Sequence, residues 1–230
     1  MSKIAISQPT YLSWLGYFQQ ISQVDCFVFL DNVQFDRRSW QCRNRIKDHN
    51  GNLIWLTVPV VKTDRNARIS DINLSDNWQT WKIKHISTIR NCLINTPYLA
   101  EVLDVLDSVY SKPFTRIADL NIEIIKTVTK RLGILTPFLR ASDLNIQGNK
   151  AELLLKICKQ LGANQYYANQ GSKIYLEAEK HMFLDENIEI HYQEFMHPIY
   201  QQRGDCFTSH LAWPDAICYQ GFDAKKLQLI

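Results

Sequence analysis

Short apolar runs alternate with amphipathic segments at both ends of the chain. Lys3–Ser7 has the pattern of a buried strand that Gln8-Pro9 closes, residues 14–21 have helical spacing, and residues 25–30 form a second apolar run. This succession predicts a βαβ unit with parallel strands. The same alternation returns later, with strands expected at 136–140, 165–168 and 187–192 and helices at 150–161 and 175–183.

The middle of the chain has a different pattern. Residues 39–46 and 53–58 flank an Asn50-Gly51 turn and predict a β-hairpin, and residues 69–74 alternate as a half-exposed strand would. Helices are expected at 78–93, 98–110 and 114–132, and Gly133 suits the end of the last one. The tail beyond Gln193 is irregular apart from a short helix near 215–219.

These elements predict an α/β fold: a Rossmann-like parallel sheet with a hairpin and a helical insertion at about residues 39–132. We expect one domain over residues 1–230. In such sheets, ligands bind beyond the carboxyl ends of the strands. The segments expected at that edge are 8–16, 31–34, 141–143 and 169–173.

Composition narrows the class of protein. The chain has 230 residues, of which 46% are hydrophobic and 21% charged, so it can bury a core without metal or disulfide support. A net charge of +3 is too weak to indicate nucleic-acid binding. The 11% of aromatic residues, with many Asn and Gln, favours a site for sugar-like or base-like groups.

Targeting signals are not evident. The N-terminal segment does not resemble a secretory signal, and no apolar run reaches the length of a membrane span. The six cysteines form no CxxC pair, and no histidine has metal-ligand spacing to a cysteine or another histidine. We therefore expect a cytoplasmic protein with reduced thiols, without membrane insertion and without a metal site; its oligomeric state is left open.

Several motifs carry a family resemblance. They are QPTYLSWLGYFQQISQVDCFVFLDNVQF (8–35), SWQCRNRIK (39–47), WLTVPV (55–60), LLKICKQLGANQYYANQGSKIYL (154–176), FMHPIYQQ (195–202), Asp215 and Gly221. Together they resemble the WbqC-like protein family, which is associated with bacterial surface-polysaccharide gene clusters. The resemblance implies a role in making an O-antigen or capsule.

A more distant similarity concerns residues 4–35. They resemble the opening of HIGH-type nucleotidylyltransferases and pantoate–β-alanine ligases, in which a His-x-Gly-His element opens the first helix. Here Trp14 and Tyr17 stand where those histidines would be. Both can donate a hydrogen bond or stack on a ring, but neither supplies a cation to phosphates. The similarity implies a shared fold and site position.

Three residues are candidates for catalysis. Asp31 directly follows a predicted strand and could act as a general base, although it could also cap its own turn. His197 lies in the FMHPIYQQ motif and could transfer a proton or serve as a buried hydrogen-bonding group. Gln8 ends the first strand and could orient a substrate.

Other residues are candidates for substrate binding. Arg43 and Arg45 share one face of the predicted hairpin and could clamp a diphosphate or carboxylate, although a solvated strand is the alternative. Gly171, Ser172 and Lys173 precede a helix and suit an anion. The remaining candidates lie near expected strand ends or in the family motifs: Tyr11, Trp14, Gly16, Tyr17, Gln34, Asn44, Ser142, Tyr175, Tyr200, Gln201 and Asp215.

The function expected from this reasoning is group transfer. The protein would transfer an acyl, aminoacyl or nucleotidyl group on a nucleotide-sugar or sugar precursor, with a nucleotide or an activated acyl donor as the possible cofactor. A non-catalytic module that binds a glycan precursor or a pathway protein is the alternative. A nucleic-acid-modifying enzyme is a third and weaker hypothesis.

Overall fold

Five parallel strands form the central sheet of the protein. The computed structural model describes residues 2–230. The strands lie in the order β5-β2-β1-β6-β7, and every neighbouring pair is parallel. Their bounds are β1 Lys3–Ser7, β2 Cys26–Phe29, β5 Phe138–Arg140, β6 Gln165–Ala168 and β7 Glu189–Tyr192. The predicted α/β, Rossmann-like fold class is confirmed.

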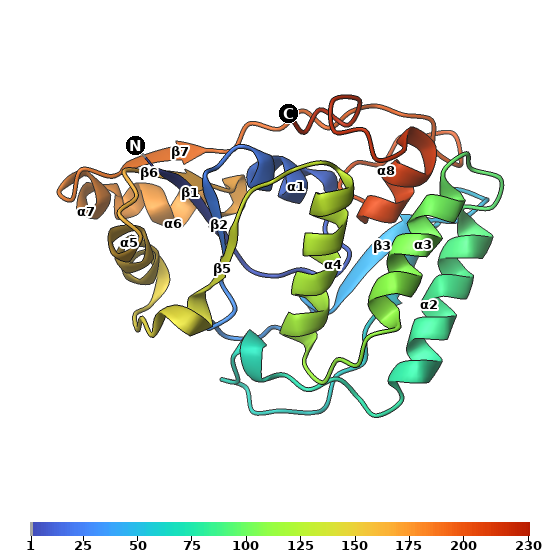
Figure 1. Ribbon diagram of the computed structural model, residues 1–230, viewed down its shortest axis with the longest axis horizontal. Helices are drawn as coiled ribbons and strands as arrows, with labels where there is room; N and C mark the ends of the chain where they lie inside the picture. Colours follow the sequence, from blue (N-terminus) through green and yellow to red (C-terminus); the bar gives the residue numbers. More distant parts are fainter. Residues whose placement is uncertain (1) are drawn as a thin grey trace.

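Both faces of the sheet are buried, because its side chains alternate between two apolar clusters. Ala5, Phe27 and Phe29 pack toward α1 (Leu15–Ser22) and the helical insertion. Ile4 and Val28 pack toward the opposite face. That second face is covered by α5 (Lys150–Gln160), α6 (Lys173–Ala178) and α7 (Lys180–Leu184) (Figure 1).

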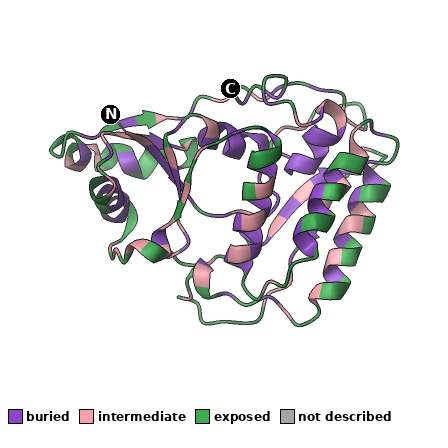
Figure 2. Cartoon of the chain, viewed as in Figure 1, coloured by how far each residue is buried: buried purple, intermediate pink, exposed green. Residues whose placement is uncertain are grey.

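The insertion between β2 and β5 contributes the hairpin and three helices. Strands β3 (Arg43–Lys47) and β4 (Leu53–Thr57) form a separate antiparallel sheet. Helices α2 (Trp78–Cys92), α3 (Leu99–Tyr110) and α4 (Ile117–Arg131) follow, and the late helix α8 (Trp213–Gln220) packs beside α3 and β3 (Figure 1). Each helix of the insertion turns a buried stripe inward and an exposed stripe to solvent (Figure 2). That the whole chain is one domain stays a prediction.

Two predicted elements differ in the structure. The strand predicted at 69–74 is wrong: Ile69–Asp71 is a single 3-10 turn, η1, followed by the isolated bridges Asn73–Arg116 and Leu74–Val60. Ile69 and Ile72 are both fully buried, and their spacing of three residues matches the period of a 3-10 helix rather than that of a strand. The helix predicted at 175–183 is divided into α6 and α7 at Glu179.

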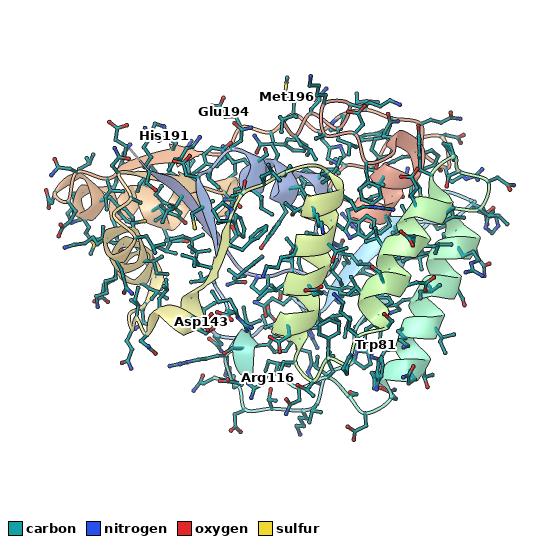
Figure 3. All side chains as sticks on the ribbon, viewed as in Figure 1. Trp81, Arg116, Asp143, His191, Glu194 and Met196 are labelled. Carbon is teal, nitrogen blue, oxygen red and sulfur yellow. The ribbon has the colours of Figure 1, made fainter. Side chains whose placement is uncertain are left out.

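The chain returns across the carboxyl edge of the sheet after β7. Residues 193–212 run along α1 toward α8, and Glu194 and Met196 lie on this segment (Figure 3). It is held by backbone hydrogen bonds from Gln193 to Ala168, from Ala212 to Arg45 and from Trp213 to Ser13. None of the helices within residues 2–230 has the length and apolar character to cross a membrane.

Candidate functional site

The strand order reverses between β1 and β6. From β1 the chain adds β2 and β5 on one side, whereas β6 and β7 extend the sheet on the other. At such a switch point the loops leaving the two central strands diverge and leave a crevice at their carboxyl ends. A cavity of about 330 Å³ lies there, and its lining includes Gln8, Gln20, Asn169, Ser172 and Tyr175. We call it the switch-point cavity.

A second cavity of about 530 Å³ lies between the turn after β1, the hairpin and the C-terminal segment. Its lining includes Trp40, Asn44, Arg45, Ser209 and His210. We call it the hairpin cavity. Thr10, Trp14 and Tyr17 line both cavities, so the two together form one cleft over the start of α1.

Trp14 divides this cleft, and Gly16 allows it to do so. A Cβ atom on Gly16 would overlap the Cη2 atom of Trp14, so the indole ring packs directly on the glycine backbone. The other side of the ring stacks on His210, with centroids 4.4 Å apart. Gly16 itself is buried under the ring and is not among the residues that line the cavities.

The turn after β1 has a strained backbone. Leu12 is fully buried and has a φ of 45°, a conformation that a branched aliphatic residue rarely adopts. The Nδ2 atom of Asn44 donates to the carbonyl oxygens of Leu12, at 2.8 Å, and Tyr11, at 3.2 Å. Asn44 therefore holds this turn in place while it also lines the hairpin cavity.

Arg45 is the charged residue of the hairpin cavity. Its guanidinium carbon lies 5.8 Å from the ring centroids of both Trp40 and Trp55. Its Nε atom is buried and has no hydrogen-bond partner within residues 2–230. A buried N–H without a partner is costly. Arg45 as a whole is half-buried and lines the cavity, so its guanidinium group can meet an anionic ligand oxygen there.

Arg43 lies on the same face of β3 but outside this cavity. Its guanidinium carbon lies 4.6 Å from the Trp55 ring centroid, and it donates to the carbonyl oxygen of Arg38 at 2.6 Å. The Trp40 and Trp55 rings are stacked with centroids 5.7 Å apart, and each side chain is 45% exposed. The hairpin therefore presents two tryptophans and two arginines beside the cleft.

Two histidines lie next to Trp14 on the C-terminal segment. Burial lowers the pKa of His197 and that of His210, and the neighbouring Arg45 lowers the latter further. Both imidazoles are therefore neutral near pH 7 and able to accept a proton. Their rings are 5.8 Å apart. His210 lines the hairpin cavity, whereas His197 packs between Trp14, Tyr200 and Phe207.

Asp31 lies in a closed ionic cluster at the carboxyl ends of β2 and β5. Its carboxylate is fully buried and accepts hydrogen bonds from Arg140 Nε at 2.8 Å and from Ser142 N and Oγ at 2.9 Å. Arg140 also pairs with Asp119 at 2.7 Å. The structure thus binds the candidates Asp31 and Ser142 to each other, apart from the residues that line the cleft.

Tyr11 belongs to a second closed cluster, beneath the turn. Its hydroxyl is 2.7 Å from Nδ1 of His85 and also bonds the hydroxyl of Tyr110. All three side chains are buried, and burial lowers the pKa of His85 to about 4. Tyr11 therefore supports the turn from below and does not line either cavity.

Tyr200 and Asp215 form a third closed cluster, with Gln202. The carboxylate of Asp215 accepts hydrogen bonds from the Tyr200 hydroxyl at 2.9 Å and from the Lys47 backbone at 3.2 Å. Burial raises the pKa of Asp215. This cluster ties the C-terminal segment and α8 to the hairpin.

The remaining candidates are dispersed. Gln34 lines a separate cavity between loops and donates to the Arg65 carbonyl, and Lys173 places its ammonium 5.4 Å from the Tyr192 ring centroid. Gln201 is exposed on the C-terminal segment. Cys42, which directly precedes Arg43 in the sequence, is not among these candidates; it is buried, and burial raises its pKa, which disfavours a thiolate there.

The cleft also contains residues that sequence reasoning did not select as site residues. Among them are Ser7, Gln20, Trp40, Gln193, Thr208, Ser209 and His210, whereas Thr10 and Asn169 lie in the segments 8–16 and 169–173 predicted at this edge. Thr10, Gln20, Trp40 and Asn169 lie within the family motifs, which could have indicated them. His210 and its neighbours lie in an irregular segment whose path becomes evident only in the folded chain.

Comparison with known proteins addresses the family. A model of the WbqC-like protein family matches residues 8–227. The chain belongs to the WbqC-like protein family. A relative from Mycobacterium tuberculosis (strain ATCC 25618 / H37Rv), described as "Uncharacterized protein Rv1507c", is 31% identical over 179 residues, covering 77% of this chain and 76% of the relative.

No solved structure matches the chain at a significant level. The family match includes the turn after β1, the hairpin, the segment after β6 and α8, so nearly all of the cleft of this WbqC-like protein lies inside it; Ile6 and Ser7, at the end of β1, precede the matched residues. The similarity of residues 4–35 to nucleotidylyltransferases stays a prediction.

Proposed function

We propose that this WbqC-like protein is a transferase of bacterial surface-polysaccharide biosynthesis. It would catalyse the transfer of an acyl, aminoacyl or nucleotidyl group in a reaction whose substrate is a nucleotide-sugar or sugar precursor. The observation that carries the proposal is the pair of cavities that meet at Trp14. Group transfer requires two reactants to be held side by side, and a cleft with two connected compartments suits that task.

The chemistry of the hairpin cavity fits an activated donor. Arg45 supplies a positive charge for a diphosphate or carboxylate, and Trp40 supplies a ring face for a base or sugar. His210, which is neutral because burial and Arg45 lower its pKa, would accept the proton from the attacking hydroxyl or amine as that atom bonds to the transferred group. The bond from this group to its carrier breaks, and the carrier leaves with the electron pair, its negative charge stabilised by Arg45. His197 lies beside His210 and would hold its position.

The test begins with ligand binding. Thermal-shift screening with nucleotides, nucleotide-sugars and acyl donors should identify ligands that stabilise the protein. Arg45→Ala should weaken the affinity for such a ligand about tenfold, since a charge-assisted hydrogen bond is lost. Arg43→Ala is the matched control, because Arg43 lies on the same strand face outside the cavity. Equal losses in both variants would argue against an anion site at Arg45.

The same variants are then expressed in a strain from which the gene for this protein has been deleted. Arg45→Ala should reduce surface polysaccharide on a gel, while Arg43→Ala should restore it. Normal polysaccharide with Arg45→Ala, at normal protein levels, would contradict the proposal.

A non-catalytic binding module is the second candidate. The resemblance of residues 4–35 to nucleotidylyltransferases favours it, because under that resemblance Trp14 and Tyr17 replace the catalytic histidines. His210→Asn separates the two functions. It keeps a polar side chain of similar shape but removes the base. A transferase loses turnover with this change and keeps ligand affinity, whereas a binding module keeps both its affinity and the cellular polysaccharide.

A further inference from the structure

The switch-point cavity is lined by uncharged residues, in contrast to the hairpin cavity with its arginine. A phosphate or carboxylate placed there would lose water without meeting a positive charge, which is unfavourable. A neutral group would not incur this cost. The partition of charge along the cleft therefore directs the anionic part of a ligand to Arg45 and a neutral part to the switch point.

A chain of hydrogen bonds fixes which atom Gln8 offers to that neutral part. The Asp36 backbone N–H can only donate, and it donates to Oε1 of Gln41 at 2.9 Å. The Nε2 atom of Gln41 therefore faces Gln8 and donates to its Oε1 at 2.8 Å. Because Oε1 of Gln8 is bound in this way, its Nε2 is the atom left for a ligand in the cavity.

Gln41 is itself held firmly. It is 2% exposed, and its backbone carbonyl accepts a hydrogen bond from Asn121 Nδ2 at 2.7 Å. Asn121 also donates to the carbonyl of Pro9, which follows Gln8 directly. The orientation of the Gln8 amide is thus set by buried groups of the insertion, not by solvent.

The opposite wall has a second amide of fixed orientation. The Oδ1 atom of Asn169 accepts from the backbone N–H of Ser172 at 3.0 Å, so its Nδ2 is the donor end. That Nδ2 is 3.5 Å from the Ser7 hydroxyl, whose own proton goes to Gln20. Donor atoms therefore come from the ends of both central strands, β1 and β6.

We propose that the switch-point cavity selects a neutral ligand group with a carbonyl oxygen, and that Gln41 sets this selectivity by orienting the Gln8 amide. The carbonyl belongs either to a nucleobase or to an acetamido sugar. Tyr17 and Trp14 supply apolar lining beside it. This inference rests on the proposed function only in taking the cleft as the substrate site.

Two substitutions, one at Gln8 and one at Gln41, replace the hydrogen-bond donor that residue 8 presents to the cavity with an acceptor. In Gln8→Glu, one carboxylate oxygen accepts from Gln41 and the other faces the cavity. In Gln41→Glu, the new carboxylate takes the Gln8 Nε2 as its donor, so the Gln8 amide turns and presents Oε1 to the cavity. Both variants offer an acceptor where the natural protein offers a donor. Gln79→Glu on the exposed surface of α2 is the control for charge.

The experiment is equilibrium binding of neutral probes to the full chain. Uridine is compared with ribose, and N-acetylglucosamine with glucose, so that each pair differs in the group that carries the carbonyl. We expect one carbonyl-bearing probe to bind at least about tenfold more tightly than its counterpart, which identifies the source. Gln8→Glu and Gln41→Glu should each lose that preference, and Gln79→Glu should keep it.

If Gln41 acts only by positioning Gln8, its substitution should have no effect on binding once the Gln8 amide is removed. In the Gln8→Ala background, Gln41→Glu should weaken binding no further, whereas a general structural defect would add its own loss. Gln8 is exposed, so Gln8→Glu folds even if the buried Gln41→Glu does not.

The proposal is overturned if neither carbonyl-bearing probe is preferred, if Gln8→Glu keeps the preference, or if inorganic phosphate displaces the probe. None of these results depends on turnover. The proposed transferase activity is tested separately, by the Arg45 and His210 variants.

Discussion

The carboxyl edge of the sheet carries two groups of polar side chains with opposite properties. At the ends of β2 and β5, Asp31, Arg140 and Ser142 bind one another, and the Asp31 carboxylate is fully buried. At the ends of β1 and β6, Gln8 binds the protein through one end of its amide and keeps the other for the cavity, and Asn169 lines the same cavity with its Nδ2 held only by a long contact to the Ser7 hydroxyl. Position at a strand end is the same in both groups, so position alone does not make a binding site.

Charge explains the difference. A buried carboxylate needs donors around it at all times, because leaving it unpaired costs several kcal/mol. Asp31 therefore recruits its partners from within the chain. A neutral amide tolerates one unbound atom at a water-filled cavity, so it can keep that atom for a ligand. Closed clusters should accordingly control stability, and open ones should control binding.

The largest effect is expected for Asp31→Ala. Removing this fully buried carboxylate leaves both donor groups of Ser142 unpaired and deprives Arg140 of one of its two carboxylate partners, so the free energy of unfolding should fall by about 3 kcal/mol. Denaturant titration measures the loss. Asp119→Ala is the control: it removes the other carboxylate of Arg140, which is 36% exposed, and should cost less than about 1 kcal/mol.

Ligand affinity completes this test. Asp31→Ala protein that remains folded should bind the ligands of the cleft as the natural protein does. A loss of affinity in folded protein, with little loss of stability, would instead place Asp31 in the binding machinery.

A second effect comes from His85 in the cluster with Tyr11. Burial lowers its pKa from 6.5 to about 4, so the folded protein resists protonation while the unfolded chain accepts the proton. This contribution to stability is complete above about pH 6.5 and falls as the pH drops toward 4, by about 3 kcal/mol in total. Urea titrations at a series of pH values measure the slope.

His85→Gln should flatten the slope between pH 4 and 6.5, because the titrating group is gone. The exposed residue Gln79 on α2 provides the control, since Gln79→Ala changes no titrating group and should leave the slope unchanged. If the two variants behave alike, His85 does not contribute the pH dependence.

Much of the fold could be predicted because it depends on local patterns. The alternation of buried side chains in β1 and β2 and the Asn50-Gly51 turn between β3 and β4 are visible in the sequence itself. The failure at residues 69–74 is also local. Ile69 and Ile72 are compatible with a strand or a 3-10 turn, and packing against the insertion decides between them.

The site could be located only in part. The rule for parallel sheets correctly directed attention to the segment after β1 and the segment after β6, which supply Gln8 and Ser172 to one cavity. The pairing of Asp31 with Arg140, 109 positions away, could not be inferred from spacing. Nor could the contact of Gln41 with Gln8, since it depends on how the insertion folds back over the turn.

The smallest expected effect on stability concerns two neighbouring tryptophans, which ligand binding should distinguish. Trp40 and Trp55 stack on each other and are equally exposed, so alanine at either position removes the same aromatic contact and should cost about 1 kcal/mol. Only Trp40 is among the residues that line the hairpin cavity. Trp40→Ala should therefore weaken binding of the tightest nucleotide ligand by about tenfold, as expected for a lost stacking contact, while Trp55→Ala leaves it within about twofold. Calorimetric titration of both variants measures the difference. Equal weakening would mean that the ligand extends over the whole hairpin face and that the open region of the molecule is larger than the cleft.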